Sequence, residues 1–290
     1  MKEMNPQKTA VLIDSGCDIP ANVREQYNIE ILPLHIMYSE KDYRDSVDID
    51  PLMVYRRFPD DLPTTSTPSI AEVTDKFDEL RDKGYERVLA FSISSALSGT
   101  YNTMRLAASE YEDLEIFVFD TRNISCGSGL YAIWAATRLQ KGESYEEICR
   151  KLPEKLGDAN VFFYMDTLKY LQRGGRIGKV AGTIGEALKL KPIISCTPEG
   201  VYYTVAKIRG AKMAKLRLAE EVVRYSFGHR TWMVVEEGDA HDEAMAMQDL
   251  LEKHEKLIHK EILFEEQITA TLALNTGPGL VGVAVMRNPD

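Results

Sequence analysis

Two clusters of hydroxyl side chains are the first candidates for binding chemistry. One spans residues 64–69 (Thr-Thr-Ser-Thr-Pro-Ser) and the other spans residues 94–100 (Ser-Ser-Ala-Leu-Ser-Gly-Thr). Both are expected at strand or helix ends on one edge of a sheet, where open α/β folds bind their ligands. Hydroxyls and free helix N-terminal amides together suit a carboxylate or a phosphate. The same residue types also cap helices and form turns, so a purely structural role stays open beside the binding role.

A glycine-arginine run at residues 173–179 (Arg-Gly-Gly-Arg-Ile-Gly-Lys) is the third candidate, and Arg209-Gly210 repeats the pairing. Glycine lets the backbone approach a ligand closely, and a guanidinium group binds carboxylate or phosphate with two hydrogen bonds. Between residues 166 and 217, eleven Lys and Arg side chains face three acidic ones, so this segment carries +8 and the remainder −18. Such a local basic field favours a specific anion or partner, although solvated helix faces would give the same count.

Two other patterns are rejected because their context is wrong. Residues 277–282 spell Gly-x-Gly-x-x-Gly, but a dinucleotide site needs a helix after these glycines, and here a strand is expected at 283–286. His254 and His259 are five residues apart, which places them on different faces of a helix. We therefore predict no metal site, no catalytic residue set and no cofactor.

The elements that would position these residues alternate between short apolar runs and amphipathic stretches, which is typical of a mostly parallel α/β sheet. Strands are expected at 10–13, 31–38, 88–93 and 114–119. Helices are expected after Pro20, after Asp50-Pro51, over 70–84 and, as a pair, between 125 and 156. The last-named single helix is expected to start at Pro68, with Ser66 or Thr67 as its cap, and to be closed by Gly84.

The second half has a different order of elements. A strand is expected at 160–165, a hairpin of 191–196 with 201–207 around the turn 198–200, and a helix over 211–225. A strand at 231–235 and a helix from 242 follow. We predict an α/β protein of two domains. Residues 1–157 form an N-terminal α/β domain with a mostly parallel sheet flanked by helices, and residues 158–290 form a C-terminal α/β domain with a mixed sheet.

Composition excludes several classes of protein. The 290 residues are 44% hydrophobic and 28% charged, which is ordinary for a globular protein and excludes collagen-like, coiled-coil and disordered chains. A net charge of −10 argues against general nucleic-acid binding. No apolar run approaches the ~18–20 residues of a membrane span, and no secretory signal is visible. Four scattered cysteines without a CxxC pair argue against a disulfide framework. We expect a cytoplasmic protein.

A series of short motifs along the chain resembles the DegV family. The motifs are Asp14-Ser15, Thr65-Ser66-Thr67-Pro68-Ser69, residues 94–101, Phe119-Asp120-Thr121, residues 166–177, Leu190-Lys191-Pro192-Ile193, Lys207-Ile208-Arg209-Gly210 and Thr276-Gly277-Pro278-Gly279. Each motif alone is weak, but their order from about residue 9 to residue 287 is specific to this two-domain α/β family.

The resemblance implies a protein that binds a long-chain fatty acid in an apolar tunnel, with the carboxyl group at the domain interface. It implies carboxylate contacts at Thr64 or Thr65, at Ser95 and at Ser98. Arg176, Arg209 and Asn275 would face the head group or a partner. In bacteria that use such proteins with a separate fatty acid kinase, the kinase phosphorylates the bound carboxylate and the carrier presents the acyl-phosphate. Transient contact with a membrane surface also fits this role, whereas a nucleic-acid partner does not.

One position departs from the family pattern. Family members with the carrier role have histidine where this chain has Asn275, and the position of Thr67 is often glutamine. Asparagine donates a hydrogen bond but cannot carry a charge or shuttle a proton. We therefore expect fatty-acid binding to be better supported than acyl-phosphate transfer.

Two other functions remain open at this point. An enzyme could use Ser95 or Ser98 as an acyl or phosphoryl nucleophile. Its base would be His35, Asp14 or Asp120, none of which the sequence places beside a serine. A pure interaction module could instead use the +8 segment to dock an acidic protein.

Overall fold

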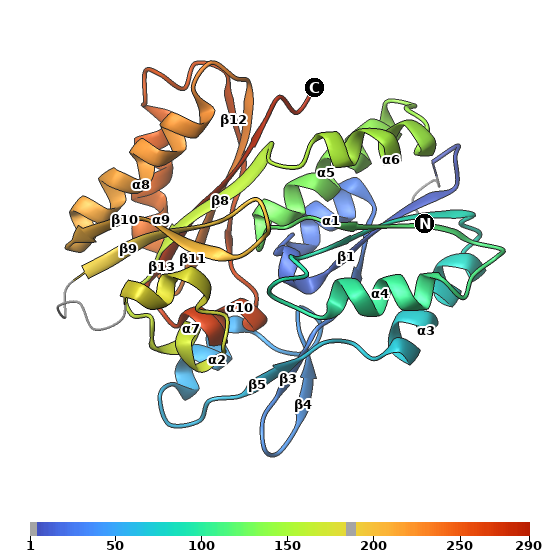
Figure 1. Cartoon of the computed structure of the whole chain (residues 1–290), viewed down its shortest axis with the longest axis horizontal. Helices are drawn as coiled ribbons and strands as arrows, with labels where there is room; N and C mark the ends of the chain where they lie inside the picture. Colours follow the sequence, from blue (N-terminus) through green and yellow to red (C-terminus); the bar gives the residue numbers. More distant parts are fainter. Residues whose placement is uncertain (1–4, 184–189) are drawn as a thin grey trace.

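The chain forms three β-sheets, and the two larger ones come from different halves of the sequence (Figure 1). The computed structural model describes residues 5–183 and 190–290. The first half forms a parallel four-stranded sheet of β2 (Ile29–Leu32), β1 (Thr9–Asp14), β6 (Arg87–Ser92) and β7 (Glu115–Asp120). The small third sheet is antiparallel and consists of β4 (Asp42–Arg44), β3 (His35–Met37) and β5 (Thr64–Ser66).

The second half forms a mixed six-stranded sheet, in which β11 and β12 are parallel and the other neighbours are antiparallel. In spatial order its strands are β10 (Tyr202–Arg209), β9 (Leu190–Cys196), β8 (Ala159–Tyr164), β13 (Leu280–Arg287), β11 (Thr231–Gly238) and β12 (Lys260–Gln267). The predicted α/β class, with a parallel sheet followed by a mixed one, is confirmed.

Ten helices accompany these sheets in the described part of the chain. They are α1 (Ala21–Tyr27), α2 (Pro51–Arg57), α3 (Ile70–Asp82), α4 (Thr100–Ala108), α5 (Cys126–Gln140), α6 (Tyr145–Glu154), α7 (Lys169–Arg173), α8 (Ala211–Ser226), α9 (His241–Glu252) and α10 (Ala270–Thr276). No described helix is both long enough and apolar enough to cross a bilayer.

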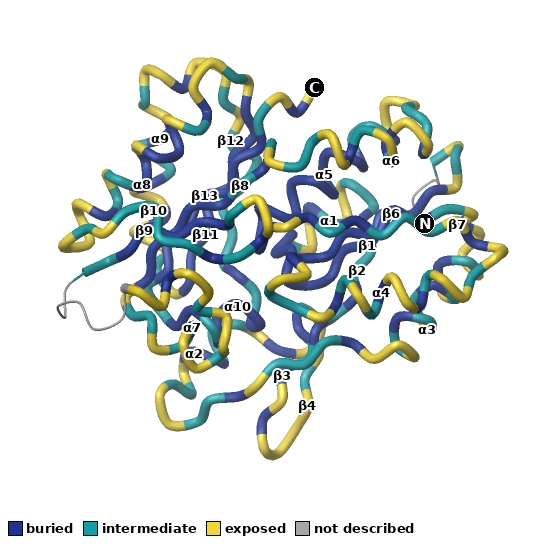
Figure 2. The backbone as a smooth tube through the Cα atoms, in the orientation of Figure 1, coloured by how far each residue is buried: buried dark blue, intermediate teal, exposed yellow. Residues whose placement is uncertain are grey.

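Helix α5 joins the two large sheets. It is buried along nearly its whole length and packs against β1 and β6 of the parallel sheet and against β8 and β13 of the mixed sheet (Figure 2). One hydrophobic cluster therefore includes Phe91, Leu130 and Met286 from all three regions. The outer faces have their own cores, under α3 and α4 on one side and under α8 and α9 on the other. The division into domains at residue 157 stays a prediction.

Two elements differ from expectation. The strand expected at 31–38 is two strands, β2 and β3, which belong to different sheets. Pro33 separates them because it has no N–H for a ladder, and the next amide, of Leu34, donates to Ser15 Oγ at 3.0 Å.

The helix start expected around Pro68 was also placed wrongly. Residues 64–66 form β5, and the cap of α3 is Ser69 instead of Ser66 or Thr67. Ser69 and Glu72 form a reciprocal capping box, which satisfies two free amides at the helix start.

Candidate ligand-binding pocket

One pocket gathers side chains from both halves of the chain, and we call it the outer pocket. It contains about 580 Å³ of space between atoms, part of which is open solvent. Its lining residues are Leu34, Thr65, Ser66, Thr67, Ile93, Leu97, Ser98, Ile124, Leu171, Arg176, Tyr202, Thr271, Leu272, Asn275 and Thr276. The lining is therefore part hydroxyl, part cationic and part apolar.

The two hydroxyl clusters meet at this pocket. Thr65 comes from the edge strand β5, and Ser98 comes from the loop between β6 and α4. A Cβ at Gly99 would lie 3.5 Å from Thr67 Cγ2, so the two segments are in close contact. Ser98 Oγ lies 2.8 Å from Thr100 Oγ1 and accepts from the Thr100 amide at 3.3 Å. The two clusters therefore lie close together, but they belong to different sheets and not, as expected, to one edge of a single sheet.

Arg176 supplies the positive charge at the exposed side of the pocket. Its Nε donates to the Leu97 carbonyl at 3.3 Å, and one terminal nitrogen donates to the Gly174 carbonyl at 2.7 Å. These are neutral partners, and no ion pair joins Arg176 to an acid in the described part of the chain. The guanidinium charge is therefore available to an anion.

Buried carboxyl groups hold the loops that form the pocket. Asp14, at the end of β1, accepts from the Gly16 amide at 3.0 Å and from Ser92 Oγ and the Ile93 amide at 2.9 Å. Burial is the main cause that raises the pKa of Asp14 to about 6. Asp45 accepts from Ser15 Oγ at 2.8 Å, and burial raises its pKa too. These bonds tie the ends of neighbouring strands together and fix the edge that carries the hydroxyls.

A hairpin from the second half closes the pocket. The predicted pairing of 191–196 with 201–207 is confirmed as β9 and β10, and Tyr202 at the start of β10 lines the pocket. The turn residue Gly200 has φ +78°, and a Cβ there would lie 2.0 Å from Ser94 Oγ. Glycine is therefore required by close approach as well as by backbone conformation.

Asn275 lies on α10 at the back of the glycine-arginine run. Its Nδ2 donates to the Thr271 carbonyl at 2.9 Å, while its Oδ1 is buried and has no hydrogen-bond partner among residues 5–183 and 190–290. A Cβ at Gly174 would lie 2.1 Å from this Oδ1. In this protein Gly174 makes room for Asn275, whereas Gly175 has φ +75° and open space around it.

A methyl group at Gly174 is expected to disturb this corner. The Gly174→Ala substitution should lower stability by about 1–3 kcal/mol, the usual result of overpacking. Shortening the neighbour in the double variant Gly174→Ala/Asn275→Ala should recover most of this loss, because the clashing amide is gone. Thermal unfolding of the wild type, both single variants and the double variant measures the coupling. Additive effects of the two substitutions would contradict the assigned contact.

The family profile described as "Uncharacterised protein, DegV family" matches residues 8–288. The chain belongs to the DegV family. A DegV domain-containing protein of Clostridium acetobutylicum is 37% identical over 281 residues, which is 97% of this chain and 99% of the relative. The predicted resemblance is thus confirmed over nearly the whole chain.

Solved DegV structures share this fold. One is described as showing fatty acid binding of a DegV family protein from Thermus thermophilus, with a TM-score of 0.88 and 28% identity over 96% of this chain and 99% of that one. Another is a stearic acid-binding protein from Eubacterium ventriosum, with a TM-score of 0.87 and 28% identity over 97% of this chain and 99% of that one. The DegV fold is therefore one on which relatives bind fatty acids.

The predicted site residues of this DegV protein divide into two groups. Thr65, Ser98, Arg176 and Asn275 line the outer pocket. The other three do not line it: Thr64 is exposed on β5, Ser95 is exposed in the loop after β6, and Arg209 is exposed at the end of β10. A ligand role for these three stays a prediction.

Ser95 has a partner that bears on the enzyme alternative. Its Oγ donates to Asp120 Oδ2 at 2.6 Å, and Asp120 Oδ1 accepts from the amides of Ser95 and Arg122, both at 3.1 Å. These three hydrogen bonds hold the Asp120 carboxylate in the turn that carries Ser95. His35 pairs elsewhere, with Asp42 at 3.3 Å and with Glu72 at 2.8 Å. Ser95 thus forms part of a turn, and His35 is not placed to act as its base.

Several lining residues were not found from the sequence. Three of them, Thr271, Leu272 and Thr276, lie with the predicted Asn275 on one face of α10, at the i, i+1, i+4, i+5 spacing of a helix. This spacing was a usable signal, although the segment is short. Tyr202 gave no signal, because only the packing of the hairpin onto the first half brings it to the pocket.

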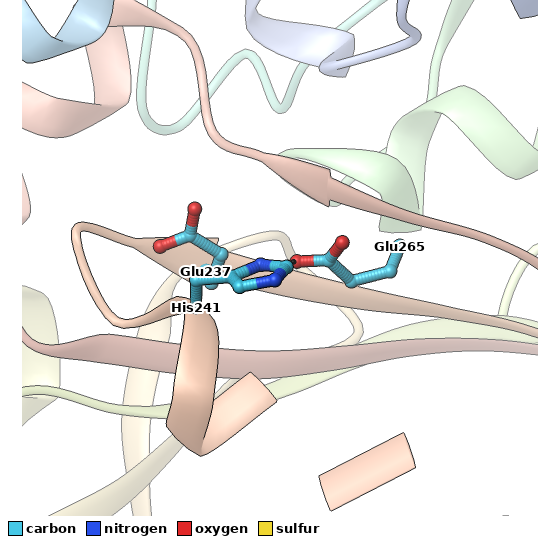
Figure 3. Close-up of side chains that lie close together, drawn as sticks. All are labelled: Glu237, His241 and Glu265. Carbon is cyan, nitrogen blue, oxygen red and sulfur yellow. Dashed lines mark hydrogen bonds and ion pairs between the residues drawn. The ribbon is translucent and has the colours of Figure 1, made fainter. Parts of the chain in front are cut away.

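A histidine-carboxylate cluster lies away from this pocket. Glu237 on β11, His241 at the start of α9 and Glu265 on β12 each offer one ligand atom, and these atoms lie within 4.8 Å of one another (Figure 3). His241 Nδ1 is 3.3 Å from Glu265 Oε1, and Glu237 accepts from the Ala240 amide at 2.6 Å. The spacing would suit a divalent cation, but these internal contacts also account for it, and the prediction of no metal site stays a prediction.

Proposed function

We propose that this DegV protein binds one long-chain fatty acid in the outer pocket, with the carboxylate beside Arg176, Ser98 and Thr65. The observation that carries the proposal is that polar and apolar side chains line different parts of one pocket. The Arg176 guanidinium, which forms no ion pair with any described residue, and two hydroxyls form its more exposed part, and the buried Ile93, Ile124 and Leu272 form the rest. Such an arrangement suits an amphipathic anion.

Head and tail contribute differently to binding. A carboxylate leaving water needs hydrogen bonds or an opposite charge, and Arg176 with the hydroxyls supplies both. The tail gains ~0.8 kcal/mol for each CH₂ that it buries. The apolar wall therefore gives affinity, and the polar wall gives orientation.

Native mass spectrometry tests this function directly. Protein purified without added lipid should carry fatty acid, and delipidated protein should take up one equivalent of stearate, oleate or palmitate. Circular dichroism and thermal unfolding establish that the delipidated sample is folded. Folded protein that stays empty with all three acids would overturn the proposal.

The exposed position of Arg176 also fits a carrier that presents its bound acid to a fatty acid kinase. A kinase could reach a carboxylate held there, because the polar side of the pocket is the exposed one. Asn275 stands where carriers have histidine, and its Nδ2 already donates to the Thr271 carbonyl at 2.9 Å. Incubation with a fatty acid kinase, ATP and loaded protein should yield acyl-phosphate. If loaded protein yields none while an established carrier does, the role is binding alone.

A further inference from the structure

The outer pocket continues into a second, smaller cavity, which we call the inner cavity. It has about 250 Å³ of space between atoms, most of it too narrow for a water molecule. It shares four lining residues with the outer pocket, namely Ile124, Tyr202, Leu272 and Thr276. Its other lining residues are Ser125, Val161, Phe163, Glu236, Ile268 and Leu280. A fatty acid with its carboxylate at Arg176 would direct its chain past the shared residues toward this cavity. The inference below rests on that proposed function.

The buried side chain of Glu236 lines the inner cavity. The lining of this cavity is therefore not uniformly apolar. Glu236, on β11, is 2% exposed, and its Oε1 accepts from the Cys126 amide at 2.7 Å. Ser125 Oγ lies 2.7 Å from the same Oε1 and also contacts Asp18 Oδ2. Asp18 Oδ1 accepts from the Thr269 amide at 3.0 Å. One hydroxyl thus bridges two carboxyl groups.

The bridge needs a shared proton. Ser125 has a single O–H, so it can donate to one carboxyl only, and the other contact forms when that carboxyl carries a proton. No described cation pairs with either acid, and burial raises the pKa of both Asp18 and Glu236. The shared proton occupies the contact with Ser125, and this leaves Glu236 Oε2 unprotonated. The Cys126 thiol, a weak donor, also interacts with the Glu236 carboxyl group, and no stronger donor among the described residues reaches Oε2.

We propose that Glu236 makes the inner cavity selective for long-chain fatty acids that carry a hydroxyl group well along the chain. A hydroxyl there would donate to Glu236 Oε2. A plain chain would instead leave a buried acceptor facing hydrocarbon without a donor, which is costly. The residual negative charge of the two acids would also repel a carboxylate, so the head group stays on the Arg176 side.

Competition binding with stearate and a series of hydroxystearates tests the proposal, with the hydroxyl moved stepwise from the second carbon to the last. We expect at least one isomer with a distant hydroxyl to bind about 10-fold or more tightly than stearate, the usual gain for a hydrogen bond to a charged acceptor. The isomer with its hydroxyl beside the carboxylate is the internal control and should show no such gain. If stearate binds and no isomer exceeds it, the selectivity is wrong but the proposed function stands. If no acid binds, the proposed function itself fails.

Donor and acceptor can then be exchanged. In Glu236→Gln, the amide oxygen keeps the Cys126 and Ser125 contacts, and the NH₂ group faces the cavity as a donor. Oxostearate with its ketone at the carbon where the hydroxyl binds best should bind the wild type no better than stearate. The ketone oxygen and Glu236 Oε2 are both acceptors and cannot form a hydrogen bond with each other. This oxostearate should gain about 10-fold in Glu236→Gln. Glu236→Leu should remove the preference for hydroxyl while stearate binding remains. An unchanged ranking of the three acids in both variants would overturn the role of Glu236.

Discussion

Replacing Arg176 with alanine is expected to weaken stearate binding by about 10- to 100-fold, because a charge-assisted hydrogen bond contributes about 1.5–3 kcal/mol. The structure supports a loss of this size, since Arg176 lines the pocket and its described partners are the neutral carbonyls of Leu97 and Gly174. The loss should shrink at high salt, because the side chain is exposed and its field is screened. Isothermal titration at two ionic strengths measures both effects.

Arg209 provides the matched control. It is also an exposed arginine next to a glycine, it belongs to the same +8 segment, and it does not line the outer pocket. Arg209→Ala should therefore leave stearate affinity within about twofold of wild type, as expected of a surface charge away from the ligand. Equal losses in the two variants would mean that the segment acts through its general field, and the head-group role of Arg176 would be wrong.

Stability should fall as the pH rises from 5.5 to 7.5, by about 2–3 kcal/mol. Burial raises the pKa of Asp14 to about 6 and that of Glu266 to about 7, and it also raises the pKa values of Asp18, Asp45 and Glu236. A group whose pKa is higher in the folded state binds protons more tightly there. Its contribution is complete below the unfolded pKa near 4 and is lost as the pH passes the folded pKa. Urea unfolding at constant ionic strength gives the change.

The Glu266→Gln variant measures how much Glu266 contributes to this pH dependence of stability. Glu266 is half-buried, so solvent screening reduces its share, and burial together with Glu265 and Glu237 causes its raised pKa. The glutamine variant should lose less stability than wild type over the same pH range. A wild-type stability that rises steadily from pH 5.5 to 7.5 would contradict the protonated state assigned to these acids.

Much of the fold was predictable because the spacing of apolar residues and the positions of turn and capping residues agree for most elements. The buried run 10–13 became β1, the hairpin around 198–200 formed as expected, and the helices after Asp50 and Pro20 begin there. The errors have local causes. Pro33 ends one strand inside a continuous apolar run, and the capping box of Ser69 and Glu72, visible in the sequence, outweighs Pro68 as a helix start.

The site was predictable only in its polar half. Thr65, Ser98 and Arg176 belong to motifs of unusual composition, and composition is readable without a structure. Leu272, Ile124 and Tyr202 are ordinary core residue types, and only tertiary packing decides whether they border a cavity or fill a core. Glu236 lies in a buried strand as one acid among the many of the sequence, and its position facing a cavity depends on β11, α5 and the loop of Asp18 meeting in space.

The two ends of the pocket draw on separate side chains, with Arg176 and Ser98 at one end and Ser125 and Glu236 at the other. Only a narrow middle, including Leu272 and Tyr202, is common to both. In the proposed binding mode, mutations at the deep end would alter which acyl chain is preferred and would leave the contacts of the acid group unchanged. On such a scaffold, the choice of tail can diverge between lineages while the handling of the head is inherited unchanged.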